Sequence, residues 1–272
     1  MTKSKPNIHI LELYNRYYMY DAGTNAIFSI TKEMCRFLMA ILNSNGEIEV
    51  GDELKEEIEY LKSKDKILGG VIEKIGHIER VTDTDLFSSV VHHIIGQQIS
   101  TKAQETIWQR LKDELGEVNA ENIYKTDISR LQSLGMSFRK AEYIKDFADK
   151  VHSGNFNLQD ISEMSDEEAI KALASLKGIG VWTAEMILLF CLQRPDIFSF
   201  DDLAIQRGLR MVYHHRKIDR KLFEKYRRRF SPYCSVASLY LWAVSGGAIT
   251  EMKDYAPKKL SLIHISEPTR LR

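Results

Sequence analysis

The chain has 272 residues, of which 44% are apolar, and its 38 basic side chains balance 38 acidic ones. This is the composition of an ordinary globular protein with one large domain or two small ones. No apolar run approaches the length of a membrane span, and no secretory signal pattern opens the sequence. The three cysteines (Cys35, Cys191 and Cys234) are too widely spaced for a disulfide framework, so we expect a cytoplasmic protein.

The first part of the chain predicts strands. Residues 17–30 have the pattern of strand, turn and strand, and a helix is expected from Lys32. Residues 1–52 loosely resemble the N-terminal leader of radical-SAM peptide-maturation enzymes, so we expect this segment to be foreign to the rest of the chain. Residues 259–272 have no helical or strand period and resemble translated vector, so we expect a non-native tail.

The sequence between these ends predicts helices. Apolar residues recur at helical spacing over 86–95 and again at Ala103, Ile107 and Leu111. A further helix is expected from Arg139 to His152, and Ser165 with Glu168 forms a capping-box sequence that starts another. Residues 181–192 are apolar nearly all round, which predicts a buried central helix.

The most informative motif is Leu176-Lys177-Gly178-Ile179-Gly180, with a helix expected from Val181. Two glycines one residue apart permit positive φ and close backbone approach, and the free N–H groups of the helix start favour an anion. A phosphate is the obvious candidate. The acidic pair Asp201-Asp202 follows about twenty residues later. A phosphate-binding hairpin close to a carboxylate indicates chemistry on a nucleic acid.

Basic side chains are concentrated after the acidic pair. Residues 205–230 contain ten Lys or Arg and two acids. Local clustering of this kind is typical of phosphate binding, although a solvated helix face is an equally good interpretation of charge alone. The position directly after Asp202 favours DNA.

Five segments in the same order resemble the helix-hairpin-helix superfamily of DNA base-excision glycosylases, in its DNA-3-methyladenine glycosylase II type. They are residues 94–100, 134–141, 176–185, 201–202 and 235–242. The resemblance covers about residues 55–255, and it implies a mostly α fold with a glycosylase domain over residues 53–258. The cysteine count excludes the iron–sulfur cluster that some members carry.

The resemblance implies that Asp202 is the catalytic carboxylate, which stabilises an oxocarbenium-like transition state or orients water. The alternative to this catalytic role is that Asp201 or Asp202 only caps the helix that follows. Both roles can be present, with one residue of the pair as the cap and the other as the catalytic group. Trp182 and Trp242 correspond to base-pocket tryptophans, although core packing is the alternative for both. Met186 and Leu203 stand where some relatives have tyrosines.

Further roles are implied by the same resemblance. Trp182 occupies the position of the Schiff-base lysine of bifunctional members, which implies a monofunctional enzyme that uses water. The expected DNA contacts are Gly178, Gly180, Thr183, Gln97, Gln98 and Arg207. Gln98 corresponds to the wedge that fills the gap left by a flipped base, and a helix-end glutamine on the surface is the alternative. The hairpin carbonyls are expected to hold a monovalent cation, and no other metal or cofactor is expected.

The sequence therefore predicts a DNA glycosylase that flips out an alkylated purine of the 3-methyladenine type, cleaves its N-glycosidic bond and leaves an abasic site. The expected partner is double-stranded DNA with damaged bases, and the protein is expected to be a monomer in the bacterial cytosol. Two alternatives are a glycosylase for oxidised or mismatched bases and a non-catalytic DNA-binding module. Carboxylates near phosphates argue against a pure binder.

Overall fold

The computed structural model describes residues 8–13, 16–21, 26–30, 54–78 and 85–257. The chain divides into two units, Met1–Lys55 and Glu56–Arg272. The division lies close to the boundary at residues 52 and 53 expected from the sequence. The separate origins of the N-terminal segment and of the tail stay predictions.

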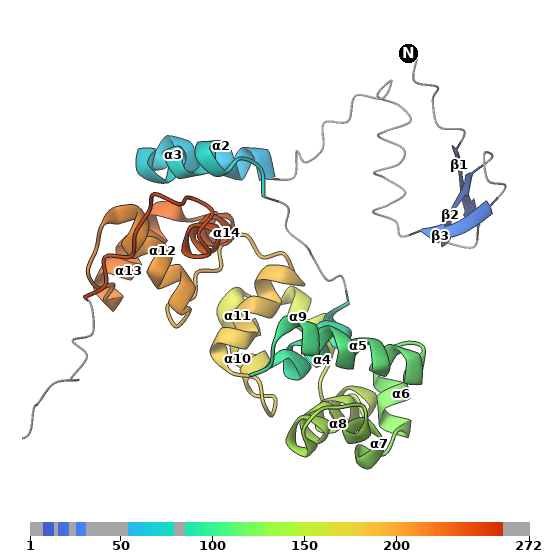
Figure 1. The fold of residues 1–272 in the computed structure, drawn as a ribbon. Coiled ribbons are helices and arrows are strands. Elements are labelled where there is room, and N and C mark those ends of the chain that lie inside the picture. The colour runs from blue at the N-terminus through green and yellow to red at the C-terminus, as the bar shows by residue number, and fades with distance from the viewer. Residues whose placement is uncertain (1–7, 14–15, 22–25, 31–53, 79–84, 258–272) are drawn as a thin grey trace, which may run out of the picture. The chain divides into compact units, whose positions relative to one another are not determined.

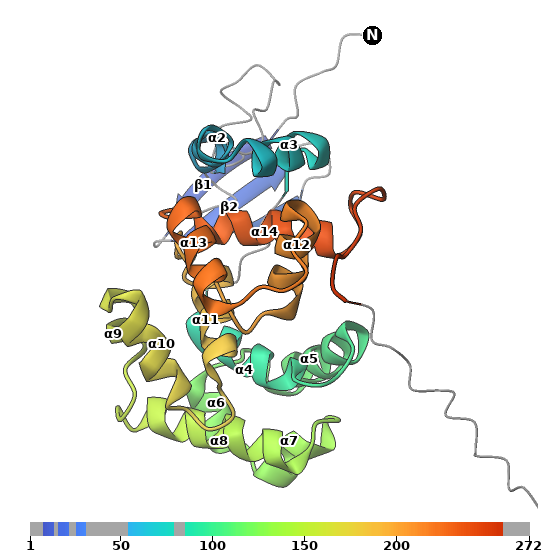
Figure 2. The ribbon, with the colours of Figure 1, turned by 90° about the vertical axis from the view of Figure 1, so that its left-hand side faces the viewer.

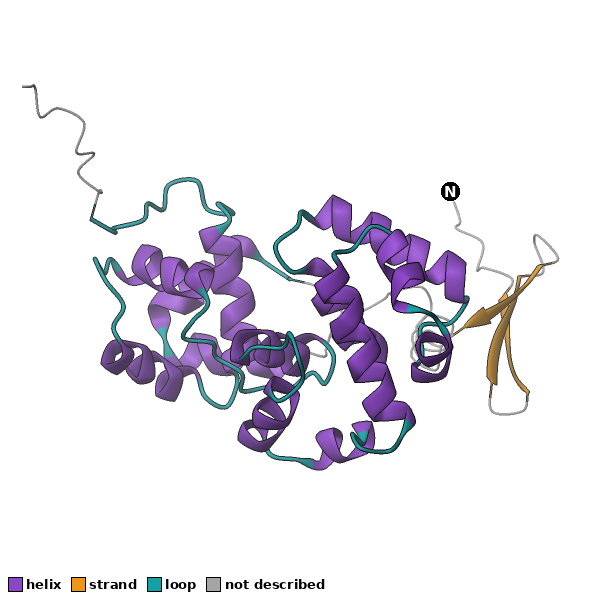
Figure 3. Cartoon of the chain, turned by 90° about the horizontal axis from the view of Figure 1, so that it is seen from below, coloured by secondary structure: helices purple, strands orange, loops and turns teal. Residues whose placement is uncertain are grey.

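The described part of the first unit is a three-stranded antiparallel sheet in the order β1-β2-β3. Its strands are β1 (Ile8–Leu13), β2 (Arg16–Asp21) and β3 (Ala26–Ile30), drawn in orange in Figure 3. In the register, Ile10 pairs with Met19, and Met19 with Phe28. The strand–turn–strand prediction is confirmed by β2 and β3, whereas β1 was not predicted. The helix expected from Lys32 lies outside the described residues.

The second unit is helical, and its described residues contain no strand (Figure 1). The helices are α2 (Lys55–Lys64), α3 (Lys66–Ile75), α4 (Leu86–Gly96), α5 (Thr101–Leu115), α6 (Ala120–Lys125), α7 (Ile128–Ser133), α8 (Phe138–His152), α9 (Leu158–Glu163), α10 (Asp166–Ala174), α11 (Val181–Phe190), α12 (Leu203–Tyr213), α13 (Arg220–Phe230) and α14 (Cys234–Ser245). The predicted mostly α fold is confirmed.

Polar caps explain where many of these helices begin. Ser165 and Glu168 form the predicted capping box at the start of α10. Ser100 and Ser137 accept hydrogen bonds from first-turn amides of α5 and α8. Such caps satisfy backbone donors that have no partner within the helix. At the other end of α8, Gly154 adopts a φ of 75°, a conformation that glycine tolerates best.

The helices of this unit form two groups, which Figures 1 and 2 show from two sides. In one group α14 packs against α3, α12 and α13, and the Tyr240 hydroxyl donates to the Gly76 carbonyl at 3.1 Å. In the other group α4 packs against α5, α8 and α11. Helix α11 is buried along most of its length, as its all-round apolar sequence predicted. None of the helices in the described part of the chain is long and apolar enough to cross a membrane.

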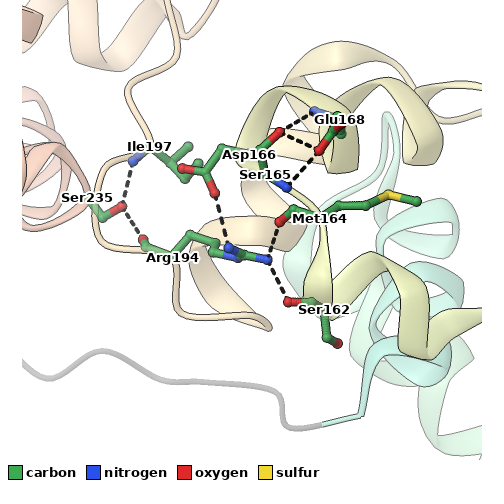
Figure 4. A network of polar contacts seen from close by, with 8 residues as sticks. All are labelled: Ser162, Met164, Ser165, Asp166, Glu168, Arg194, Ile197 and Ser235. Carbon is green, nitrogen blue, oxygen red and sulfur yellow. Dashed lines mark hydrogen bonds and ion pairs between the residues drawn. The ribbon is translucent and has the colours of Figure 1, made fainter.

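The segment between α11 and α12 is fixed by a polar network around Arg194 (Figure 4). The Arg194 guanidinium donates to the carbonyls of Ser162 and Met164, both at 2.9 Å. The Ser235 hydroxyl donates to the Arg194 carbonyl at 2.6 Å and accepts from the Ile197 amide at 3.0 Å. This segment leads directly to Asp202, so the network links the position of the acidic pair to both helix groups.

Candidate active site

The glycine hairpin lies between α10 and α11. Gly178 has a φ of 82°, and a Cβ added there would lie 2.3 Å from the ring of Tyr143. Both constraints require glycine at this position. Gly180 is the N-cap residue of α11, and no side chain of the described residues caps this helix. The first amides of α11 therefore remain available to an anion, as the motif predicted.

A second turn, between α4 and α5, is bonded to the hairpin. The Gln97 side chain donates from Nε2 to the Gly178 carbonyl at 2.6 Å. Lys140 Nζ donates to the carbonyls of Ile95 and Gln97 at 2.8 and 2.6 Å, and burial lowers the pKa of this amine. The Gln97 side chain therefore joins two turns of the protein, and its role as a DNA contact stays a prediction.

Gln98 differs from its neighbour. It is exposed and has a φ of 56°. A positive φ is uncommon in residues other than glycine and usually marks a turn under constraint. The side chain that was predicted as the wedge is thus presented on the surface, next to a turn held in place by Gln97 and Lys140.

Asp202 is buried, with 6% of its surface exposed, and its carboxylate accepts four hydrogen bonds. Oδ1 accepts from the amides of Ala204 and Ile205 at 2.9 and 2.8 Å and from Trp242 Nε1 at 3.1 Å. Oδ2 accepts from Trp182 Nε1 at 2.9 Å. A carboxylate offers about four lone-pair sites, two on each oxygen. Oδ2 therefore has capacity left for a water or a substrate atom.

Asp202 is also the N-cap residue of α12, whereas Asp201 is exposed. The helix cap is thus Asp202, the same residue that is predicted to be catalytic, and its catalytic role stays a prediction. The cap fixes the position of the carboxylate at the N-terminal end of α12.

Two tryptophans from different helices meet at this carboxylate. Trp182 belongs to the first turn of α11 and is 45% exposed. Trp242, on α14, stacks on Phe190 with ring centroids 5.7 Å apart. Sequence reasoning missed Phe190, because α11 is apolar nearly all round and nothing in that pattern distinguishes one side chain from the next.

Three other predicted site residues differ in exposure. Leu203 follows Asp202 and is 78% exposed. Met186 is buried at 4%, so it packs in the core, and its role in the base pocket stays a prediction. Thr183 is buried at 7%, so little of its side chain is accessible, and its role as a DNA contact stays a prediction.

The basic residues after Asp202 are partly neutralised within the protein. Arg210 donates two hydrogen bonds of 2.7 Å to Asp254, and Arg229 donates to Asp65 at 2.8 Å. Arg207 is more exposed and lies 3.8 Å from the Asp254 carboxylate. The ten basic residues counted in the sequence are therefore not all available to phosphates, because several have internal acidic partners.

The described residues contain no cluster of three or more His, Cys, Asp or Glu side chains that could hold a metal ion. The monovalent cation expected at the hairpin would use backbone carbonyls. The Leu176 carbonyl accepts from the Ile179 amide at 3.1 Å, and the Gly178 carbonyl accepts from Gln97. Each carbonyl has a second lone pair, so these bonds are compatible with a cation.

Comparison with known proteins agrees with this geometry. A DNA-3-methyladenine glycosylase 1 from Schizosaccharomyces pombe is 32% identical over 182 residues, which cover 64% of this chain and 78% of the relative. YfjP of Bacillus subtilis, described as a candidate DNA-3-methyladenine glycosylase, is 30% identical, and the match spans 64% of each chain. The chain thus matches less than two thirds of that relative's length.

Solved structures give the same result. A DNA-3-methyladenine glycosidase from Bacillus halodurans is 33% identical, with a TM-score of 0.65 over 72% of this chain and 91% of that chain. The S. pombe enzyme in complex with abasic DNA is 29% identical, with a TM-score of 0.61 over 70% and 97%. A family model described as "HhH-GPD superfamily base excision DNA repair protein" matches residues 91–232, just over half of the chain. The protein therefore belongs to the HhH-GPD superfamily of base-excision DNA repair proteins.

Proposed function

We propose that the protein is a monofunctional DNA glycosylase that releases alkylated purines of the 3-methyladenine type by hydrolysis of the N-glycosidic bond. The observation that carries this proposal is the Asp202 carboxylate, which is buried, held by four donors and adjacent to two indoles. The relatives named as DNA-3-methyladenine glycosylases support the same assignment.

The hairpin and Asp202 have complementary tasks. The uncapped amides at the start of α11 bind a phosphate of the damaged strand, while Gln98 fills the gap left by the flipped nucleotide. Asp202 then faces the sugar through Oδ2, where a negative charge stabilises the oxocarbenium-like transition state. Because the carboxylate is held rigidly by its four donors, little reorganisation is needed as positive charge develops.

The indoles favour a cationic base. A purine alkylated at a ring nitrogen carries positive charge while it is bonded to the sugar, and the faces of Trp182 and Trp242 attract cations through their quadrupoles. Such a base also leaves as a neutral molecule once the glycosidic bond breaks, so the site needs no separate acid to protonate it. This chemistry favours alkylated purines over neutral oxidised bases.

The test is release of bases from duplex DNA treated with a methylating agent, analysed by chromatography. We expect the unmodified protein to release 3-methyladenine, and Asp202→Asn to lower the rate by about 10²–10³-fold, the cost of losing one electrostatic stabiliser. Asparagine is also a good N-cap, so this variant keeps the start of α12.

Asp201→Asn is the matched control, since Asp201 is the exposed neighbour. It should retain near-normal release. Loss of activity in Asp201→Asn with normal Asp202→Asn would move the catalytic role by one residue. Binding of damaged DNA by the unmodified protein without any base release would instead identify a non-catalytic binder.

A further inference from the structure

Glu185 is a half-buried carboxyl group close to the site that the proposed reaction does not use. It lies on α11 three residues after Trp182, and residues at this spacing are neighbours on one face of a helix. An acidic side chain in the most apolar helix of the unit carries a desolvation cost. Its presence there requires a specific partner.

That partner is Ser199, whose hydroxyl donates a hydrogen bond to Glu185 Oε2. Ser199 is completely buried and precedes Asp202 by three residues. The contact therefore joins α11, which carries Trp182, to the segment that carries Asp202. The same segment is held on its other side, where Gln206 Nε2 donates to the Phe200 carbonyl at 2.7 Å.

Charged groups surround Glu185 from two further directions. Asp201 and Asp202 approach from the segment before α12, and Arg220 approaches from α13, where its guanidinium lies 4.7 Å from the Phe200 ring centroid. Burial raises the pKa of Glu185 above its usual value, and the two aspartates add to this effect against Ser199 and Arg220. Glu185 therefore loses its charge at a higher pH than an exposed glutamate.

We propose that Glu185 is a positioning residue, whose carboxylate holds Ser199 and thereby fixes Asp202 against the two indoles. The inference rests on the proposed function, because its importance is for the orientation of the catalytic carboxylate. Hydrogen bonds to an ionised acceptor are about twice as strong as neutral ones, so the charged form of Glu185 holds the segment best.

The proposal predicts a link between Glu185 and the pH dependence of catalysis. As the pH falls through the raised pKa of Glu185, its carboxylate is protonated, the contact with Ser199 weakens and base release slows. In Glu185→Gln the acceptor remains but the charge is absent. This variant should release bases more slowly at neutral pH. The low-pH side of its rate profile should lack the ionisation of Glu185.

The experiment compares Glu185→Gln, Ser199→Ala and the double variant of the full chain with Glu167→Gln, an exposed glutamate on α10, as the control. Single-turnover base release is measured against pH. We expect Glu185→Gln and Ser199→Ala each to lose about tenfold or more in rate, because small misplacements of catalytic groups are costly. The double variant should lose no more than either single one, and Glu167→Gln should match the unmodified protein.

A second measurement is independent of activity. The indole N–H signals of Trp182 and Trp242 report directly on the Asp202 carboxylate, while Trp108, on α5, serves as an internal reference. In NMR spectra at one pH, both variants should shift the first two signals and leave the third in place.

These two measurements separate the possible failures. If the unmodified protein releases no base, the proposed function is wrong, and the indole signals still decide the positioning role. Unchanged pH profiles and indole signals in folded Glu185→Gln would overturn the positioning role, as would additive losses in the double variant. If Glu185→Gln does not fold, Ser199→Ala examines the same contact from the other side, with the same outcomes.

Discussion

Trp182 combines two properties that a lysine at the same position would not have. Its indole N–H donates to Asp202 Oδ2, and its exposed ring offers an aromatic face beside the hairpin. A lysine there would provide an amine able to attack the sugar. The indole at this position provides no amine, which supports the proposed hydrolysis over covalent catalysis with strand cleavage.

We predict an intact DNA strand with an abasic site as the product, and no covalent complex after borohydride treatment. Lys177 near the hairpin is paired with Asp146 at 2.6 Å, which raises the pKa of its amine and keeps it protonated. The measurement is gel electrophoresis of labelled damaged duplex with borohydride, before and after alkaline treatment. A trapped complex that disappears in Lys140→Arg would assign a nucleophilic amine to Lys140, whose pKa burial lowers.

The resemblance to a known family predicted three site residues, Asp202, Trp182 and Trp242, and the structure brings all three into contact. Their roles in the reaction stay predictions. Exposure was harder to predict, because the burial of Thr183 depends on how α11 packs against other helices. Glu185 was missed for a related reason, since its partner Ser199 is distant in sequence and no local pattern connects them.

At the scale of the helices, the α2–α3 turn illustrates how a single acid can stabilise a packed element. Asp65 is 3% exposed and caps α3 by accepting from the amides of Ile67 and Leu68. It also pairs with Arg229 on α13. Burial alone would raise the pKa of Asp65, but the Leu68 amide and Arg229 outweigh it, so the pKa is lowered.

We predict that Asp65→Ala lowers the free energy of unfolding by about 2 kcal/mol at neutral pH, from the lost cap and a partly screened ion pair. Because the folded-state pKa is lowered, this stabilisation is present above the unfolded value near 4 and disappears as the pH falls through the folded value. Urea unfolding at pH 7 and near pH 2 measures it. Asp65→Asn keeps the cap and should lose less of the free energy of unfolding. An equal loss for Asp65→Ala at both pH values would contradict the prediction.

Helix starts were predicted well, because caps such as Ser165 with Glu168 are local in sequence. The apolar stripe over residues 86–95 likewise became α4. The strand β1 was missed because its pattern, with a histidine and a glutamate among apolar residues, is short and gains its definition from pairing with β2. Pairing between segments is a non-local property that periodicity does not contain.

For the whole molecule, the zero net charge conceals an uneven use of basic residues. Arg207 and Arg210 are on the same helix and share Asp254, but their side chains are 52% and 17% exposed. Arg210 is held in an internal ion pair, whereas Arg207 is exposed and only loosely paired, so its role as a DNA contact stays a prediction. Counting basic residues in the sequence therefore overestimates the number that bind DNA.

We predict that the two arginines differ in their contribution to the salt dependence of DNA binding. Arg207→Ala should reduce the slope of log affinity against log salt by about 0.9, the loss of one phosphate contact in duplex DNA. Arg210→Ala should leave that slope unchanged and lower the melting temperature instead. Fluorescence anisotropy across a salt series measures the slopes, and equal slopes for the two variants would show that Arg207 makes no phosphate contact.

The bond between Gln97 and Gly178 has a consequence for the search along DNA. It connects the turn of Gln98, the predicted wedge, with the hairpin, the predicted phosphate site, in the absence of DNA. Two turns that are already joined lose little conformational freedom when both engage the duplex, so the entropic cost of each encounter is small. Under the proposed function, this preorganisation favours binding to the duplex, and Gln98 meets each base step in a fixed register with the phosphate bound at the hairpin.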